Sequence, residues 1–181
     1  VFAAGNLIGT EIADPLYFAG APCPAGRICR RSDAAFASYA PGVPFSLGHI
    51  YRTVNRVGPF LGPGSINICH LSPTAHCTLQ IVGEQPFPVV GLELAKIGRT
   101  TGWTWGTVSA TCVNANVAGT IITQLCQDIV NGAGVAGGDS GSPVFRRVTP
   151  SQVHLYGLLW GGNAAGNMFV FSRMRNIQAE L

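Results

Sequence analysis

The sequence predicts an all-β protein of two units, with one short helix at the C-terminal end. Of its 181 residues, 24 are glycine and 12 are proline, and only 10% are charged; such a composition is typical of turn-rich β folds. Short apolar runs separated by glycine and proline favour strands joined by turns. Pro86-Phe87-Pro88 is the best linker, so we expect one unit over residues 1–87 and a second over 88–181.

In the first unit, turn residues interrupt the strand pattern. We expect a strand near Asn6–Ile12, one or two hairpins between Pro41 and Pro63 with His49 on a strand, and a strand over Thr78–Val82.

The pattern of the second unit is more regular. The expected elements are a strand, turn and strand over Val90–Val108, a hairpin over Cys112–Cys126 that turns near Ala118-Gly119, strands over Ser142–Arg147, Val153–Gly162 and Met168–Phe171, and a helix over Arg173–Leu181 capped by Ser172. The four-residue spacing of Ile177 and Leu181 predicts that both are buried on one helix face.

Six cysteines fall into three pairs that are close in sequence: Cys23 with Cys29, Cys69 with Cys77, and Cys112 with Cys126. An even number of cysteines without a Cys-x-x-Cys motif indicates disulfides and an oxidising compartment, although six cysteines allow about fifteen connectivities. His70 and His76, next to Cys69 and Cys77, leave zinc binding as a second choice.

The formal net charge is +3, from ten arginines and Lys96 against eight acids. This charge is too small and too scattered for a nucleic-acid surface, and we expect Arg30-Arg31 and Arg146-Arg147 to be solvated pairs. No apolar run is long enough for a membrane span. We therefore expect a secreted, soluble monomer without a cofactor; a first residue Val1 in place of Met predicts a processed form or a fragment.

The most informative stretch is Gly138-Asp139-Ser140-Gly141-Ser142-Pro143. Glycines allow a sharp turn that aims successive N–H groups at one point. A serine hydroxyl next to such donors can attack a carbonyl while the N–H groups of Gly138 and Ser140 receive the charge on its oxygen. A plain turn between strands is the alternative, and an α/β-hydrolase elbow is disfavoured because it needs glycine at position 142.

This stretch resembles the nucleophile loop of the chymotrypsin-like serine proteases, and among them the secreted bacterial enzymes of the α-lytic-protease and streptogrisin type. It departs from their commonest version at Ser142, where a second glycine is usual. The resemblance covers residues 30–39 and 90–181 most strongly. It implies two six-stranded antiparallel Greek-key barrels, the first of them incomplete here, and a protein or peptide substrate.

The resemblance also assigns roles to three further residues. Ser32-Asp33-Ala34-Ala35-Phe36 is similar to the segment that carries the acid of the catalytic triad, so Asp33 is the expected partner of the base. Gly98-Arg99-Thr100-Thr101-Gly102-Trp103 looks like the first hairpin of the second barrel, which implies that Arg99 pairs with a buried Asp139. Without the resemblance, Asp33 is a turn or helix-cap residue and Arg99 a solvated one.

Substrate contacts follow from the same resemblance. Trp160-Gly161 is similar to the strand on which these enzymes bind the substrate backbone, although Leu159 replaces a usual serine. Gly134, six residues before Ser140, corresponds to the floor of the primary specificity pocket. Because Gly134 and Gly161 have neither a charge nor a bulky side chain, we expect an open pocket for apolar side chains.

No histidine precedes Asp33 where this family carries its base. Thr74-Ala75-His76-Cys77 looks like the base segment, but it follows Asp33 in the chain and would need another acid such as Asp128, so we expect His76 to be a turn residue. A fragment of a longer protease is therefore the favoured hypothesis, and an inactive relative that binds peptides is the alternative. A third option is sugar stacking by Trp103, Trp105 and Trp160.

Overall fold

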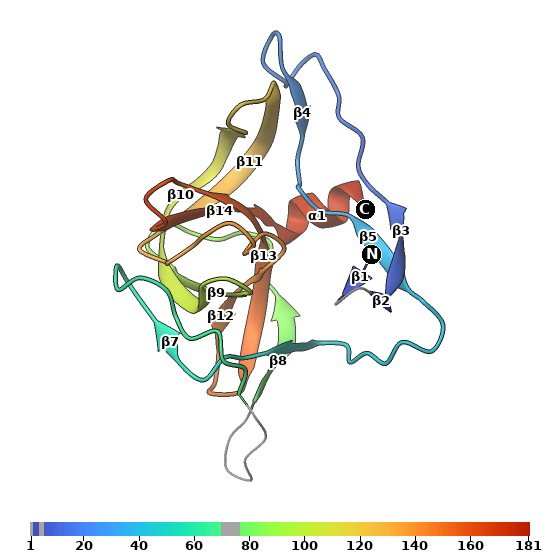
Figure 1. Cartoon of the computed structure of the whole chain (residues 1–181). Helices are drawn as coiled ribbons and strands as arrows, with labels where there is room; N and C mark the ends of the chain where they lie inside the picture. Colours follow the sequence, from blue (N-terminus) through green and yellow to red (C-terminus); the bar gives the residue numbers. More distant parts are fainter. Residues whose placement is uncertain (1, 4–5, 70–76) are drawn as a thin grey trace.

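The computed structural model describes residues 2–3, 6–69 and 77–181 and consists of strands with one short helix, as the sequence predicted (Figure 1). The elements are β1 (Phe2–Ala3), β2 (Asn6–Leu7), β3 (Gly9–Ala13), β4 (Ile28–Arg30), β5 (Phe36–Tyr39), β6 (His49–Tyr51), β7 (Arg56–Val57), β8 (Thr78–Glu84), β9 (Glu93–Gly98), β10 (Gly102–Asn116), β11 (Ile122–Asn131), β12 (Pro143–Arg147), β13 (Gln152–Gly162), β14 (Met168–Arg173) and α1 (Met174–Glu180).

The second half of the chain forms a closed six-stranded barrel. Around it the strands follow the order β9, β10, β11, β14, β13, β12 and return to β9, and each neighbouring pair is antiparallel. Because β12 follows β11 in sequence but not in space, their connection crosses the barrel end as in a Greek key. β13 is longer than its neighbour β12, whose ladder with it stops at Leu158, so residues 160–162 overhang it.

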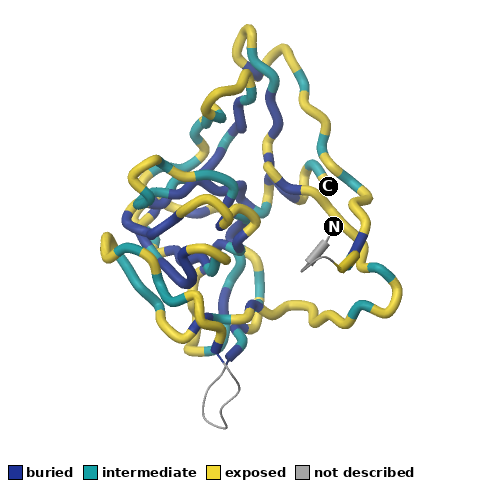
Figure 2. Tube along the Cα trace, in the orientation of Figure 1, coloured by how far each residue is buried: buried dark blue, intermediate teal, exposed yellow. Residues whose placement is uncertain are grey.

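Large apolar side chains fill the barrel and hold it together. Alternate residues of a strand point to opposite faces, so each strand contributes one row to the interior. Figure 2 shows the buried residues concentrated there. This core contains Leu94, Val108, Val130, Ala133, Val135, Val144, Tyr156, Leu159, Phe169 and Phe171.

The first half of the chain adds strands to the outside of this barrel. β8 runs parallel to β13 and pairs with β6, while β4 and β7 run parallel to β11 and β10. β3 and β5 form a separate ribbon, on the right of Figure 1. Within the described residues the first half closes no barrel, which agrees with the predicted incomplete first barrel. Its largest apolar contact is a second cluster in which Ile50 and Leu79 pack on Phe145 and Val153.

All three predicted disulfides are present, joining Cys23 to Cys29, Cys69 to Cys77, and Cys112 to Cys126. The sulfurs of Cys69 and Cys77 are bonded to each other and are not available as zinc ligands. His70 and His76 lie outside the described residues, and so does the prediction for His76.

The C-terminal helix differs from the prediction at both ends. It begins at Met174 after an N-cap at Arg173, and the Ser172 side chain does not cap it. The Ser172 hydroxyl instead donates to Gln127 Oε1 at 2.8 Å. Ile177 is buried as predicted, but Leu181 is 42% exposed because the helix ends before it. No helix in the described part of the chain has the length and apolar character needed to cross a membrane.

A buried ion pair joins this end of the chain to the barrel. The Arg173 guanidinium donates to both carboxylate oxygens of Asp128, through Nε at 2.9 Å and through Nη2, and the Cys112 N–H donates to Oδ1 at 2.9 Å. Asp128 is therefore committed to Arg173, which argues against its use as a catalytic acid. Burial raises the pKa of Asp128, and the bonds from Arg173 and Cys112 oppose that rise.

We predict that Arg173→Leu lowers the free energy of unfolding by about 3–5 kcal/mol, because it leaves a buried carboxylate without its cation. Urea unfolding at pH 7 measures this. Arg146→Leu removes an exposed arginine from β12 and is the control, with an expected change within about 0.5 kcal/mol. Equal effects of the two substitutions would contradict the prediction.

Candidate active site

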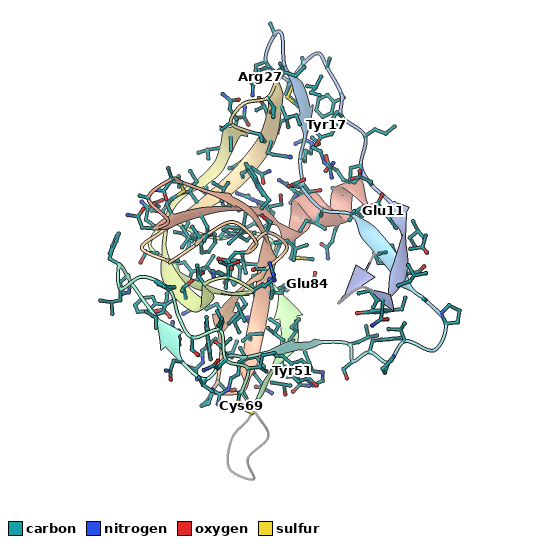
Figure 3. The ribbon with its side chains drawn as sticks, in the orientation of Figure 1. Glu11, Tyr17, Arg27, Tyr51, Cys69 and Glu84 are labelled. Carbon is teal, nitrogen blue, oxygen red and sulfur yellow. A yellow bond between two sulfur atoms is a disulfide. The ribbon has the colours of Figure 1, made fainter. Side chains whose placement is uncertain are left out.

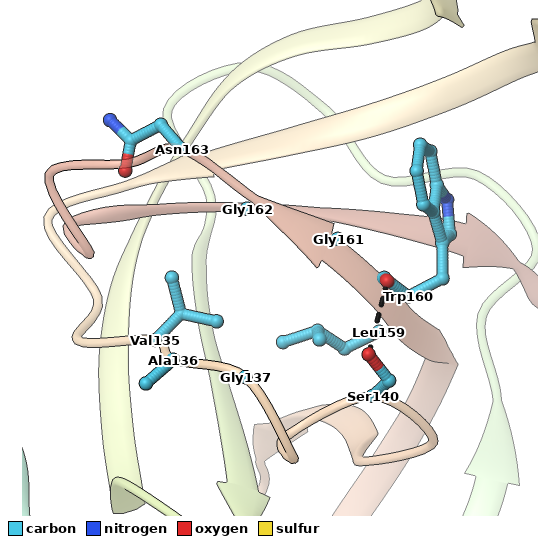
Figure 4. Close-up of a pocket in the computed structure, with 9 residues that line it drawn as sticks. All are labelled: Val135, Ala136, Gly137, Ser140, Leu159, Trp160, Gly161, Gly162 and Asn163. Atoms are coloured by element: carbon cyan, nitrogen blue, oxygen red, sulfur yellow. Dashed lines mark hydrogen bonds between the residues drawn. The ribbon is translucent and has the colours of Figure 1, made fainter. Parts of the chain in front are cut away.

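Ser140 lies on the turn between β11 and β12, at a cavity of about 280 Å³ (Figure 4). Its side chain is exposed, and its Oγ donates to Trp160 O on β13 at 3.1 Å. The N–H of Gly141 donates to Leu159 O at 2.7 Å and ties the turn to the same strand. The serine hydroxyl is therefore held at the overhanging end of β13.

Two backbone N–H groups on this turn are free. Gly138 has a φ of +96°, in the left-handed region that favours glycine, and a Cβ there would stand 2.6 Å from Thr100 Oγ1. Among the residues that the structure describes, no acceptor takes the N–H of Gly138 or of Ser140. Free donors next to a hydroxyl are what an oxyanion requires.

The Asp139 carboxylate is completely buried beneath the turn and accepts five hydrogen bonds. Oδ1 accepts from the N–H groups of Thr100 and Thr101 at 2.9 and 3.0 Å. Oδ2 accepts from Thr101 Oγ1 at 2.6 Å, and from Lys96 Nζ and the Ala136 N–H at 3.1 Å each. Burial acts to raise the pKa of Asp139, but the Thr101 bonds and the Lys96 charge together outweigh it and the pKa is lowered.

The cation that pairs with Asp139 is Lys96, so the predicted pairing with Arg99 is wrong. Lys96 is on β9 and points inward, with no exposed surface, whereas Arg99 is on the exposed β9–β10 turn. Lys96 Nζ also donates to Gly102 O at 3.0 Å and to the Thr101 hydroxyl. Burial lowers the pKa of Lys96, and the charge of Asp139 partly offsets this effect. A lone lysine in the apolar run Leu94-Ala95-Lys96-Ile97 is the signal in the sequence that could have identified it.

Asp33 lies on the segment between β4 and β5, next to β14. Its N–H donates to Ser172 Oγ at 3.0 Å. Its carboxylate is exposed, and no described residue bonds to it. Asp33 and Ser140 line two different cavities, and Trp160 lines both of them. The Asp33 carboxylate is thus available to a hydrogen-bonding partner that is not among the described residues.

A buried arginine fixes the segment that carries Asp33. The Arg30 guanidinium donates to Ser32 O at 2.5 Å, to Ala34 O at 2.9 Å and to Asp14 Oδ1 at 3.0 Å. Arg30 is 3% exposed, so its prediction as a solvated residue is wrong, because the chain curls around its side chain. Arg146 and Arg147 are exposed as predicted.

A buried glutamine connects the Asp33 segment with the overhanging strand. Gln127 Oε1 accepts the Trp160 indole N–H and the Ser172 hydroxyl, both at 2.8 Å. Its Nε2 donates to Arg31 O at 2.7 Å. Ser172 in turn accepts the N–H of Asp33, so a hydroxyl on β14 connects Gln127 with the Asp33 segment. No pattern in the sequence singled out Gln127.

No charged residue that the structure describes lines the cavity beside Ser140, which is bordered by both polar and apolar surface. Val135, Leu159, Trp160 and Gly161 line it. Gly134 lines a separate cavity with Gly62 and Gly132, and a Cβ at Gly134 would stand 2.5 Å from Gly62 O, so this glycine permits a close backbone approach. Val135 borders the cavity at Ser140 and packs against Gly162, since its Cγ1 lies 2.8 Å from where a Cβ at Gly162 would be.

No histidine that the structure describes lines this cavity. His49 is exposed on β6 with its Nδ1 2.8 Å from Leu47 O, and His154 lies on β13 beside Gly83. The third option, sugar stacking by the three tryptophans, is not supported either, because Trp103 is buried in the second apolar cluster.

Comparison with solved structures identifies the fold. A glutamic-acid-specific serine protease has a TM-score of 0.61 and 18% identity, with 97% of this chain and 72% of that chain covered. Nocardiopsis protease has a TM-score of 0.56 and 16% identity, over 97% and 77% of the two chains. Thermobifida fusca protease A has a TM-score of 0.55 and 21% identity, over 96% and 76%.

No family model and no curated protein matches the sequence. At these identities the likeness shows the fold alone: the chain has the fold of the bacterial chymotrypsin-like serine proteases, and it spans about three quarters of the length of these three solved structures.

We predict that Lys96→Met lowers the free energy of unfolding at pH 7 by about 3–5 kcal/mol, because Asp139 keeps its charge but loses its cation. A carboxylate with a lowered pKa contributes stability above its unfolded pKa of about 3.9, and this stability is lost as the pH falls through the lower folded pKa. Without Lys96 the folded pKa rises toward the unfolded one, so the stability that protonation of Asp139 removes becomes smaller and is fully lost at a higher pH. Urea unfolding from pH 3 to pH 7 measures both effects.

Arg99→Met is the matched control, because Arg99 is exposed and has no described contact with Asp139. We expect a change within about 0.5 kcal/mol and no displacement of the acid transition. If Arg99→Met lowers the free energy of unfolding more than Lys96→Met does, Arg99 and not Lys96 is the cation that pairs with Asp139.

Proposed function

We propose that this chain is the larger part of a secreted, monomeric serine endopeptidase that cleaves after apolar residues through an acyl-enzyme. The observation that carries the proposal is the Ser140 turn, in which an exposed hydroxyl and two free N–H groups are held over a buried, fully bonded Asp139. A plain β-turn needs none of these features. Three disulfides favour an oxidising compartment.

In the proposed reaction a histidine takes the Ser140 proton and Asp33 orients that histidine. Ser140 Oγ attacks the peptide carbonyl carbon, and the N–H groups of Gly138 and Ser140 stabilise the oxyanion. The imidazolium returns the proton to the leaving amine as the C–N bond breaks. Water, deprotonated by the same histidine, then attacks the ester and releases the acid and Ser140. No cofactor takes part.

The substrate backbone binds along residues 160–162 as an added strand. These residues pair with β14 on one side and overhang β12 on the other, next to Ser140. Backbone bonds to such an edge hold a peptide of any sequence in an extended form, and pockets select its side chains. The side chain that precedes the cleaved bond enters the cavity lined by Val135 and Leu159.

We propose that the base lies outside these 181 residues, in an upstream segment that completes the unit over residues 1–87; the unit over 88–181 is the closed barrel. Two observations support this. The Asp33 carboxylate is exposed beside the site without a described partner. Tyr39, Phe45 and Tyr51 line one hollow of the first half and are each more than half exposed, as expected of apolar side chains that lack their cover.

The alternative is an inactive relative that binds peptides in the same cleft. It is favoured by the absence of any described histidine at the Ser140 cavity. In that case Ser140 would serve only as a hydrogen-bonding group to the bound peptide.

The test is to sequence the encoding gene upstream of Val1 and to assay the longer product on apolar peptide substrates. We expect an upstream histidine and peptide cleavage, and Ser140→Ala should reduce kcat by about four to six orders of magnitude. Ser46→Ala, at an exposed serine in the first half of the chain, is the control and should leave kcat unchanged. If no histidine lies upstream and no cleavage appears, the binding function replaces the protease.

We further predict that Val135→Gly shifts the preference of the longer product from small toward aromatic side chains before the cleaved bond. Removing this side chain deepens a cavity of about 280 Å³. The ratio of kcat/KM for Phe over Ala should rise by about 10- to 100-fold. Val148→Gly, at an exposed position after β12, is the control that should leave the ratio unchanged. An unchanged ratio in Val135→Gly would place the specificity pocket elsewhere.

A further inference from the structure

A second cavity, of about 480 Å³, adjoins the one at Ser140, because Trp160, Gly161 and Gly162 line both. Its walls come from the β10–β11 hairpin, from β14 and from the segment that carries Asp33. Tyr17, on the segment between β3 and β4, also lines it (Figure 3). A peptide bound along residues 160–162 would therefore pass both cavities.

The lining of this second cavity is apolar except at a few positions. Ile122, Val117, Met168 and Val170 supply apolar surface. Among the described residues that line it, Asp33 is the single charged one and none carries a cationic group. Such a pocket accepts an apolar stem and disfavours a carboxylate.

Gln124 on β11 lines the same cavity and has an unmatched polar atom. The side chain is 2% exposed, and its Oε1 is buried without a hydrogen-bond partner among the described residues. Buried amide oxygens in native proteins nearly always accept a bond, because an unpaired one keeps its full desolvation cost. Gln127, three residues later in the same strand, has both ends of its amide bonded. The unpaired Oε1 of Gln124 thus indicates a position where a hydrogen-bond donor is missing.

We propose that Gln124 determines specificity in this second cavity, where its amide oxygen accepts a hydrogen bond from the end of a substrate side chain. The preferred side chain has an apolar stem and a neutral N–H or O–H donor at its tip, as glutamine has. This inference rests on the peptide cleft of the proposed function, but it concerns binding and does not depend on catalysis.

The test uses the 181-residue chain with Ser140→Ala and fluorescein-labelled hexapeptides of alanine and valine. In each peptide one of the three residues that precede the residue in the Ser140 cavity is replaced by glutamine, methionine or glutamate. Fluorescence anisotropy then measures the Kd of each peptide. Glutamine and methionine are nearly equal in size and differ in the donor. At one of the three positions we expect glutamine to bind about five- to tenfold more tightly than methionine, and glutamate more weakly than both.

Gln124→Met should abolish the preference for glutamine at that position and leave the binding of the parent peptide unchanged. Its urea midpoint should stay equal or rise, because it removes an unpaired polar atom from the interior. Gln80→Met, at an exposed position on β8, is the matched control and should change neither quantity.

The outcomes separate this inference from the proposed protease. If the parent peptide binds but glutamine and methionine are equal at all three positions, or if the preference survives in Gln124→Met, Gln124 has no such role. If the preference is present but the longer product cleaves nothing, the subsite stands and the protease fails. If no peptide binds, both the cleft and the subsite are excluded.

Discussion

The burial of one carboxylate controls the geometry of the Ser140 turn. Asp139 has no exposed surface, and its five donors come from β9, from the β9–β10 turn and from the approach to Ser140 itself. A charge in this position is tolerated only if every donor stays in place. The residues on either side of Asp139 are therefore fixed as well, which keeps the Gly138 and Ser140 N–H groups free. Preorganised donors of this kind need no rearrangement when charge develops on a substrate.

The amide of Gln127 is a second buried polar group, and its hydrogen bonds hold the other side of the cleft together. It bonds the Trp160 ring and, through Ser172, the backbone of Asp33, so that the overhanging strand and the acid segment share one anchor. Arg30 and Glu180 hold the same segment from its other sides, with Glu180 accepting the Ser32 N–H at 2.8 Å. Because each of these groups is satisfied only in one arrangement, the cleft has little freedom to widen.

Local patterns in the sequence were sufficient for the barrel strands, the three disulfides and the Ser140 turn, because these depend on strand periodicity, close cysteine pairs and glycine spacing. They were not sufficient for Lys96, Arg30 or Gln127. Whether a polar side chain points inward depends on strand register and on partners from distant segments, such as Asp139, 43 residues from Lys96. The resemblance misled at Arg99 for the same reason, because Lys96 on the neighbouring strand β9 makes the contact with Asp139 that was expected of Arg99.

The two halves of the chain differ in how completely they bury their apolar residues. The barrel buries its own Phe169 and Phe171 completely, and it covers Ile50 and Leu79 of the first half with its outer surface. The β5 ribbon and the segment that follows it have no such support: Tyr39 and Phe45 stack on each other at 4.5 Å, yet both are more than half exposed. Two aromatic rings stacked in solvent gain less than rings packed against a third surface. An added segment that covers them would thus be stabilised by the same region of the chain that presents Asp33, so the burial of these rings and the placement of a base at Asp33 would be coupled.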